Sequence, residues 1–197
     1  MKKIVKLLLI CFVIAGFFLV YWLWPSDEGL PILDEVEAFQ LDDVHGEGFE
    51  LTNGKVKLVA FFFTNCPDIC PLTMVDFKEI QSILKEEGLF ADKVELVSIS
   101  LDPANDLPEV ITDYAANFQA DPQGWKWLRG TSEKTRQIAN EFQMQYELED
   151  GTVLYHSTTM YLLDEHNKIR ALYDMALSGK PVEKETIVED IALLTGN

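Results

Sequence analysis

The sequence predicts an α/β protein built on a parallel sheet, with one apolar segment ahead of it. Predicted strands and helices alternate from residue 58 onward, which is typical of a parallel sheet with helical crossovers. Two cysteines follow directly on the first of these strands. The 197 residues are 48% hydrophobic and 25% charged, a composition that favours one folded domain over a disordered chain.

The N-terminal segment has the features of a membrane anchor. Residues 7–24 are uncharged and apolar, a length that can span a bilayer. Three lysines precede the segment and aromatic residues stand at its far end, which predicts a cytoplasmic N-terminus. We therefore expect residues 1–26 to form the cytoplasmic N-terminus and a single-pass anchor in the cell membrane. Residues 27–197 are expected to form a domain on the extracytoplasmic side.

Two alternatives apply to the same segment. A cleaved signal peptide would need a small-x-small pattern after the apolar run, and none follows. A lipoprotein signal at Cys11 would need a small residue before the cysteine, where Ile10 stands. Cys11 is therefore expected to have no role.

The charge of the predicted domain limits its partners. Three of the 16 basic residues precede the apolar segment, so 13 remain against 33 acidic ones, a net charge of −20. Such a surface excludes nucleic acid as a partner and repels anionic lipid. It either favours a basic protein partner or serves solubility alone.

The elements follow in order. Residues 27–37 are acidic and predict a short stalk, and residues 37–52 alternate around a turn that holds His45, as a β-hairpin does. Further strands are expected at 58–63, 94–101, 125–128, 152–163 and 169–173, and helices from Pro71, at 108–118, from Thr131 or Ser132, and at 183–194. His166 lies in the polar loop before the last strand, so we expect it, like His45, to be a solvated surface residue.

The cysteine pair, Cys66 and Cys70, lies between a strand and a helix. In a parallel α/β sheet this position, beyond the carboxyl end of a strand, is where sites are usually built. Cys70 falls at the helix start, where free N–H groups and the helix dipole favour a thiolate. The alternative is a structural disulfide, which would close a small loop and constrain the unfolded chain little.

The order of elements, with a dithiol after the first core strand, describes a thioredoxin-like fold with inserted elements. In thioredoxin-type oxidoreductases two residues separate the cysteines and a proline faces them. Here three residues separate them, and residues 124–180 contain no proline. The start of the 152–163 strand is expected to face the cysteines, and it offers His156. A histidine on a strand is often structural, but two thiolates and an imidazole form a soft ligand set suited to copper.

Three segments together resemble the Sco/SenC family: FTNCPDICP at 63–71, SISLDP at 98–103 with Asp106 and Pro108 after it, and His156-Ser157 before an apolar strand. The resemblance extends from the apolar segment to the last helix. It implies copper handling during assembly of cytochrome c oxidase, at the dinuclear copper site of subunit II. Cys66, Cys70 and His156 match the copper ligands of that family.

The sequence departs from the family pattern at three positions. Asn65 and Tyr155 stand where many members have histidine and aspartate, and Asn105 stands where arginine is frequent. These changes leave the ligands in place but alter the groups around them. We expect a copper metallochaperone, with a thiol-disulfide reductase that keeps the oxidase cysteines reduced as the alternative. The spacing of Thr64 and Cys66 does not fit a peroxidase, and Met160 is expected to lie in the core.

Overall fold

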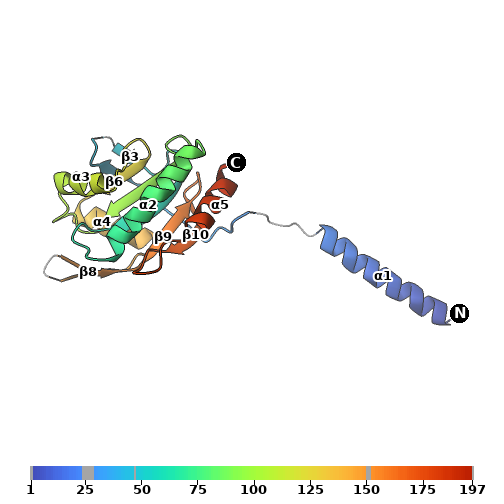
Figure 1. Cartoon of the computed structure of the whole chain (residues 1–197). Helices are drawn as coiled ribbons and strands as arrows, with labels where there is room; N and C mark the ends of the chain where they lie inside the picture. Colours follow the sequence, from blue (N-terminus) through green and yellow to red (C-terminus); the bar gives the residue numbers. More distant parts are fainter. Residues whose placement is uncertain (1, 24–28, 47, 150–151, 197) are drawn as a thin grey trace.

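The computed structural model describes residues 2–23, 29–46, 48–149 and 152–196, and it has one large and one small sheet (Figure 1). The large sheet has eight strands in the order β1-β10-β9-β4-β5-β6-β2-β3, and the small one pairs β7 with β8. The strands are β1 Asp34–Glu35, β2 Gln40–Asp43, β3 Gly48–Glu50, β4 Val56–Phe62, β5 Val94–Ser100, β6 Trp125–Arg129, β7 Tyr146–Glu149, β8 Thr152–His156, β9 Thr159–Leu163 and β10 Lys168–Asp174. The helices are α1 Lys2–Leu23, α2 Ile69–Glu86, α3 Pro108–Asn117, α4 Ser132–Glu141 and α5 Lys184–Thr195.

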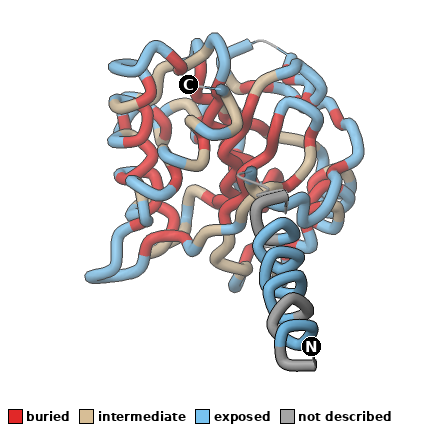
Figure 2. Tube along the Cα trace, turned by 90° about the vertical axis from the view of Figure 1, so that its right-hand side faces the viewer, coloured by how far each residue is buried: buried red, intermediate tan, exposed pale blue. Residues whose placement is uncertain are grey.

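The centre of the large sheet is parallel and fully covered. β4 pairs with β5, and β5 with β6, both in parallel register. Every residue of β4 and β5 is buried, as expected for strands with helices on both faces. Figure 2 shows buried segments running through the interior of the folded part. The predicted parallel arrangement is therefore confirmed for β4, β5 and β6, whereas the other pairings of the large sheet are antiparallel.

Adjacent phenylalanines of β4 supply the core on the two faces of the sheet. On one face, Phe62 stacks on Tyr114 of α3 at 5.9 Å and meets Trp127 edge-on at 5.0 Å. On the other face, Phe61 meets Phe142, just after α4, edge-on at 5.3 Å. Because successive strand residues point to opposite faces, the short aromatic run of β4 fills both layers.

The other predicted elements are mostly confirmed. β2 and β3 form the expected antiparallel hairpin, with Leu41 opposite Phe49. β9 and β10 form the closing antiparallel pair. Thr131 caps α4, since its side-chain oxygen accepts the amide hydrogen of Lys134. Met160 is fully buried in the core, as predicted.

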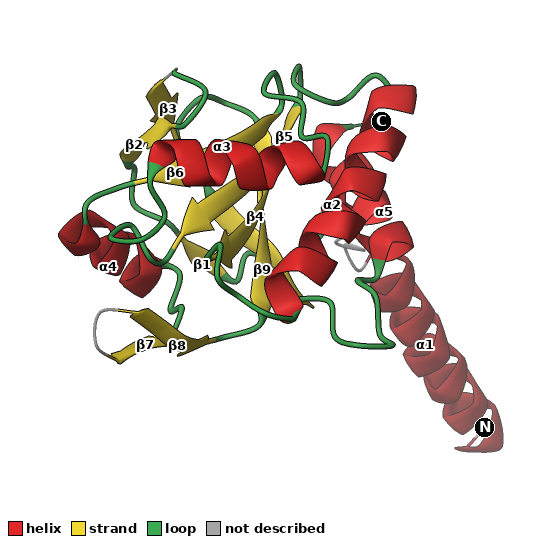
Figure 3. Cartoon of the chain, turned by 60° about the vertical axis from the view of Figure 1, so that its left-hand side comes forward, coloured by secondary structure: helices red, strands yellow, loops and turns green. Residues whose placement is uncertain are grey.

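Two predictions about the strands are wrong. The single strand expected at 152–163 is divided into β8 and β9, and β8 belongs to the small sheet with β7, which was not predicted. β9 is held by β4 and β10, whereas β8 pairs with β7 in a ribbon that lies apart from the large sheet (Figure 3). The stalk expected at 27–37 instead contains β1, which pairs with β10 and is followed by the buried Val36.

The predicted anchor forms a helix, α1, over Lys2–Leu23. Across the described ranges, no helix combines the length and the apolar character that crossing a membrane requires, so the predicted transmembrane span is not supported. The predicted boundary between residues 26 and 27 lies outside the described residues.

Gly124, just before β6, provides a test of how closely the chain packs against Phe90 and Ala91. A Cβ atom at Gly124 would lie 2.8 Å from the amide nitrogen of Ala91 and from the ring of Phe90. We expect Gly124→Ala to lower the free energy of unfolding by about 1–3 kcal/mol in denaturant titration, because backbone must shift to admit the methyl group. Gly48→Ala, whose Cβ would meet nothing within 4 Å, is the control and should change stability by less than about 0.5 kcal/mol. Equal stability of both variants would contradict this packing.

Candidate metal centre

The loop between β4 and α2 carries both cysteines. A turn closes over it, in which the Cys66 amide donates to the Phe63 carbonyl over 3.1 Å. Cys70 is the second residue of α2 and is fully buried, whereas Cys66 is half-buried. The Cys70 amide donates to Cys66 Sγ over 3.4 Å. Asp68 makes no side-chain cap, so the Cys66 sulfur accepts one of the free N–H groups at this helix start.

His156, the last residue of β8, reaches the cysteines from the other side. Its Nε2 lies 3.5 Å from Cys70 Sγ, and its Nδ1 lies 2.8 Å from the Ser157 carbonyl oxygen. A carbonyl only accepts hydrogen bonds, so the contact assigns the proton to Nδ1 and leaves the Nε2 lone pair free. The Phe63 ring meets the imidazole edge-on at 5.8 Å. This arrangement presents Nε2 as a ligand atom.

The three ligand atoms form one group. The sulfurs of Cys66 and Cys70 and a ring nitrogen of His156 all lie within 4.8 Å of one another. Among the described residues this is the one cluster of cysteine, histidine and carboxylate side chains that could hold a metal ion. The structure therefore brings together all three residues that the sequence singled out.

The two thiols differ sharply in acidity. A hydrogen bond from the Cys70 thiol is the largest cause that lowers the pKa of Cys66, to about 4, despite partial burial. The pKa of Cys70 is raised, because its thiol donates to Cys66, is buried and faces the Cys66 thiolate. At a pH between the pKa values of the two thiols, the reduced pair holds one proton, and that proton is on Cys70. Cys66 is thus the nucleophile and Cys70 the protonated partner.

A buried carboxylate supports the cysteine loop. Asp106 Oδ1 accepts the amide of Thr64 at 3.1 Å and the Thr64 hydroxyl at 2.5 Å, and Asp106 Oδ2 accepts the Ser100 hydroxyl at 2.6 Å. Burial raises the pKa of Asp106, and the hydrogen bonds from Ser100 and Thr64 oppose that rise. Arg129 donates to the backbone carbonyls of Pro103 and Asp106 at 2.7 and 2.8 Å. Asp106 therefore ties the end of β5 and the start of α3 to the loop that precedes Cys66.

The structure also accounts for two of the departures from the family pattern. Tyr155 is 54% exposed, and the group that orients the His156 ring is the backbone carbonyl of Ser157 rather than a preceding side chain. Asn105 donates to both carboxylate oxygens of Asp102 at 3.0 Å. Tyr155 thus faces solvent, and Asn105 has a partner in its own loop. Neither residue disturbs the ligands.

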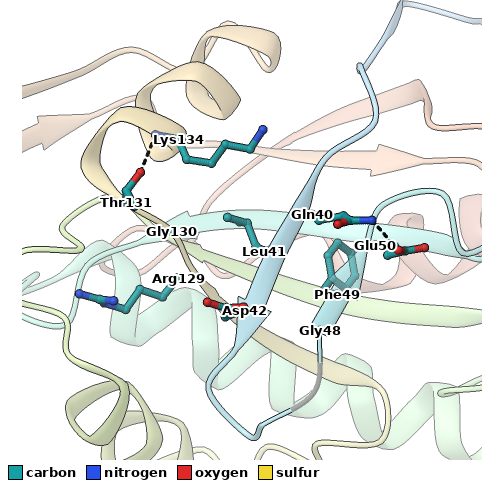
Figure 4. A pocket seen from close by; sticks show the side chains of 10 residues that line it. All are labelled: Gln40, Leu41, Asp42, Gly48, Phe49, Glu50, Arg129, Gly130, Thr131 and Lys134. Carbon is teal, nitrogen blue, oxygen red and sulfur yellow. Dashed lines mark hydrogen bonds between the residues drawn. The ribbon is translucent and has the colours of Figure 1, made fainter.

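The other two histidines lie elsewhere. His45 is in the turn between β2 and β3, with Nδ1 3.1 Å from Asp43, and His166 has a side chain that is 73% exposed. Both match the prediction of surface residues. A groove of about 490 Å³ lies between this hairpin and the start of α4 (Figure 4). None of the three ligand residues lines it, and two of its polar groups, Gln40 and Glu50, already bond to each other.

The fold and the site define a class of protein: a thioredoxin-like α/β domain with a metal-ligating or redox-active dithiol and a histidine. The model of the SCO1/SenC family matches residues 31–193. The chain belongs to this family.

Solved structures of the family share the fold. The SCO1/SenC family lipoprotein from Bacillus anthracis str. Ames is 31% identical, with a TM-score of 0.73 over 83% of this chain and 96% of that one. BsSco, a member of the Sco family of cytochrome c oxidase assembly proteins with an identified disulfide switch, is 26% identical, with a TM-score of 0.72 over 85% and 98%. Arabidopsis thaliana ScoI with copper bound is 27% identical, with a TM-score of 0.64 over 79% and 97%.

The acidity of Cys66 predicts its reactivity. In the reduced full chain carrying Cys11→Ser, we expect iodoacetamide to label Cys66 at a nearly constant rate from about pH 9 down to pH 5. The rate should then fall with a midpoint near the pKa of about 4, because protonation removes the thiolate. Peptide mass spectrometry should find Cys70 unlabelled over the same range. A Cys66 rate that rises through pH 8–9, as for an ordinary thiol, would contradict the assignment.

Proposed function

We propose that the protein is a copper metallochaperone for cytochrome c oxidase, with the dinuclear copper site of subunit II as its target. The observation that carries this proposal is the convergence of Cys66, Cys70 and His156 within 4.8 Å. Family members solved with copper bound, and the description of BsSco as an oxidase assembly protein, support it. The target within the oxidase rests on the resemblance of the cysteine segment.

The donor atoms suit copper in either oxidation state. Two sulfurs and one imidazole nitrogen form a soft set of low coordination number, which Cu(I) favours, and two thiolates balance the charge of Cu(II). The Nδ1–H bond to the Ser157 carbonyl fixes the ring and leaves Nε2 for the metal. Copper binding would release the proton held by Cys70, so copper affinity should fall as the pH falls.

Access to the site differs between its ligands. Cys66 is half-buried and Cys70 is fully buried. An incoming ligand of the acceptor protein can therefore reach copper on the Cys66 side, while Cys70 and His156 still hold it. This order of exchange gives each ligand a distinct role in transfer.

The second candidate, a thiol-disulfide reductase, is favoured by the low pKa of Cys66 beside a protonated Cys70. The Cys66 thiolate would attack a disulfide of the partner, forming a mixed disulfide and releasing one partner thiolate. Cys70 would then lose its proton and attack Cys66, which forms the Cys66–Cys70 disulfide and releases the second partner thiolate. The partner is reduced by two electrons, and the dithiol is oxidised by two.

The reductase alternative requires a partner disulfide, which persists in an oxidising compartment. We propose that residues 27–197 act on the extracytoplasmic side, in association with the membrane, where such disulfides persist. The three N-terminal lysines support this orientation, and a structural relative in the family is a lipoprotein.

The role of the cysteines as copper ligands can be tested by visible absorption spectroscopy. Cys66→Ser and Cys70→Ser should each abolish the intense sulfur-to-copper charge-transfer absorption of the Cu(II)-loaded protein, because each removes a thiolate ligand. Cys11→Ser, in α1, is the matched control and should keep the full absorption. Full absorption in either of the first two variants would place copper elsewhere.

His156 separates the two candidate functions. His156→Ala should weaken copper binding at least about tenfold in a competition titration, since one of three ligands is lost. The same variant should still form and exchange the Cys66–Cys70 disulfide, because the Cys70 hydrogen bond is the largest cause of the low Cys66 pKa.

The exposed His166 supplies the control, and His166→Ala should match the parent in both assays. If His156→Ala binds copper as the parent does but oxidase assembly fails, the metallochaperone assignment of this residue is wrong.

A further inference from the structure

Three segments meet around the candidate metal centre. Asp106, just before α3, bonds to Thr64 of the cysteine loop, and His156 at the end of β8 contacts Cys70 of α2. Residues within a few positions of these contacts therefore lie near the ligands.

Each segment places two large apolar side chains on the surface beside these contacts. We call these six residues the apolar rim. Their exposed fractions are Leu72 37%, Val75 48%, Leu107 41%, Val110 39%, Leu154 57% and Tyr155 54%. The first pair begins two residues after Cys70, and the second directly follows Asp106. Leu72 and Val75 lie on one face of α2, three residues apart, whereas Leu107 is the N-cap of α3 and Val110 lies in its first turn. The third pair, on β8, directly precedes His156, and its two side chains lie on opposite faces of the β7–β8 ribbon because successive strand residues alternate.

Exposed large apolar side chains are more frequent near the site than elsewhere on the domain. In the described part of the chain beyond α1, the remaining exposed large apolar side chains are Ile32, Leu33, Leu148, Leu172, Leu177 and Leu193. Half of the total therefore lies within five residues of a contact that builds the site. Exposed apolar surface that gathers in this way marks a place of interaction.

The charge on the segments that carry the rim is mostly negative, and Lys78, one turn after Val75 on α2, is the basic residue nearest to the rim in the sequence. Residues 64–77, 102–118 and 145–158, which carry the rim and the ligands, contain no lysine or arginine. Asp68, Glu109, Asp113 and Glu147 are exposed on them. The guanidinium of Arg129, from β6, donates to the backbone carbonyls of Pro103 and Asp106. A second copy of this chain, with the same acidic face, would be repelled, as would anionic lipid.

We propose that the apolar rim is the docking surface for a partner protein that has exposed apolar side chains, a basic border and its own sulfur ligands. The proposal rests on the proposed function and adds the surface that the metal acceptor contacts. The apolar contacts exclude water around the exchanging sulfurs, and the acidic residues select a basic partner and speed its approach.

The test is copper transfer from the full chain to two acceptors. One is the copper-site domain of oxidase subunit II, and the other is bathocuproine disulfonate, a small Cu(I) chelator that needs no docking surface. Leu107→Ser/Val110→Ser and, independently, Leu72→Ser/Val75→Ser should slow transfer to the protein about tenfold and leave the chelator rate within about twofold. Raising salt from about 50 to 500 mM should slow the parent's transfer to the protein about tenfold.

Leu193→Ser is the matched control, since Leu193 is 58% exposed on α5 and lies outside the rim. It should transfer copper to both acceptors at the parent rate. Parent rates in both rim variants, or transfer that does not depend on salt, overturn the docking surface while the proposed function stands. A parent dimer that both rim variants abolish in sedimentation also overturns it, because a second copy would then cover the rim. Transfer by the parent to the chelator alone overturns the proposed function itself.

Discussion

The antiparallel pairing of β9 with β4 is the constraint on which the candidate site depends. Cys70 and His156 are 86 residues apart in the chain. β4 runs toward the cysteine loop, and β9, paired with it from Ala60↔Met160 to Lys57↔Leu163, runs away from it. The chain that enters β9 must therefore pass the carboxyl end of β4. His156 lies three residues before β9, so the sheet itself delivers the imidazole to the thiols.

The same geometry links metal binding to thiol chemistry. The buried Cys70 thiol and the Cys70 amide both donate to the Cys66 sulfur, so the reduced pair carries one negative charge and one proton. A bound copper ion would replace that proton, and a disulfide would remove both sulfur ligands. The proposed chaperone and the alternative reductase thus use one set of atoms, and the histidine is the feature that a dithiol reductase needs least.

Much of this arrangement could be predicted from the sequence. The aromatic run of β4 and the helical spacing after Pro71 locate the dithiol, because both signals are local. The break between β8 and β9 was missed, since residues 152–163 have the composition of one strand and only their pairing partners separate them. The contact of Asp106 with Thr64 was also missed, because no local pattern reveals a bond between residues 42 positions apart. The ligand role assigned to His156 came from its expected place facing the dithiol together with a family resemblance. The prediction of a membrane span is not supported in the described part of the chain.

The central claim is that Cys66, Cys70 and His156 act together as copper ligands. X-ray absorption spectroscopy of the full chain loaded with one equivalent of Cu(I) tests it most directly, because it identifies the atoms bound to the metal. The account predicts two sulfur neighbours and one imidazole nitrogen, with the imidazole signal absent in His156→Ala. A copper shell without sulfur, or an imidazole signal that survives in His156→Ala, would contradict it.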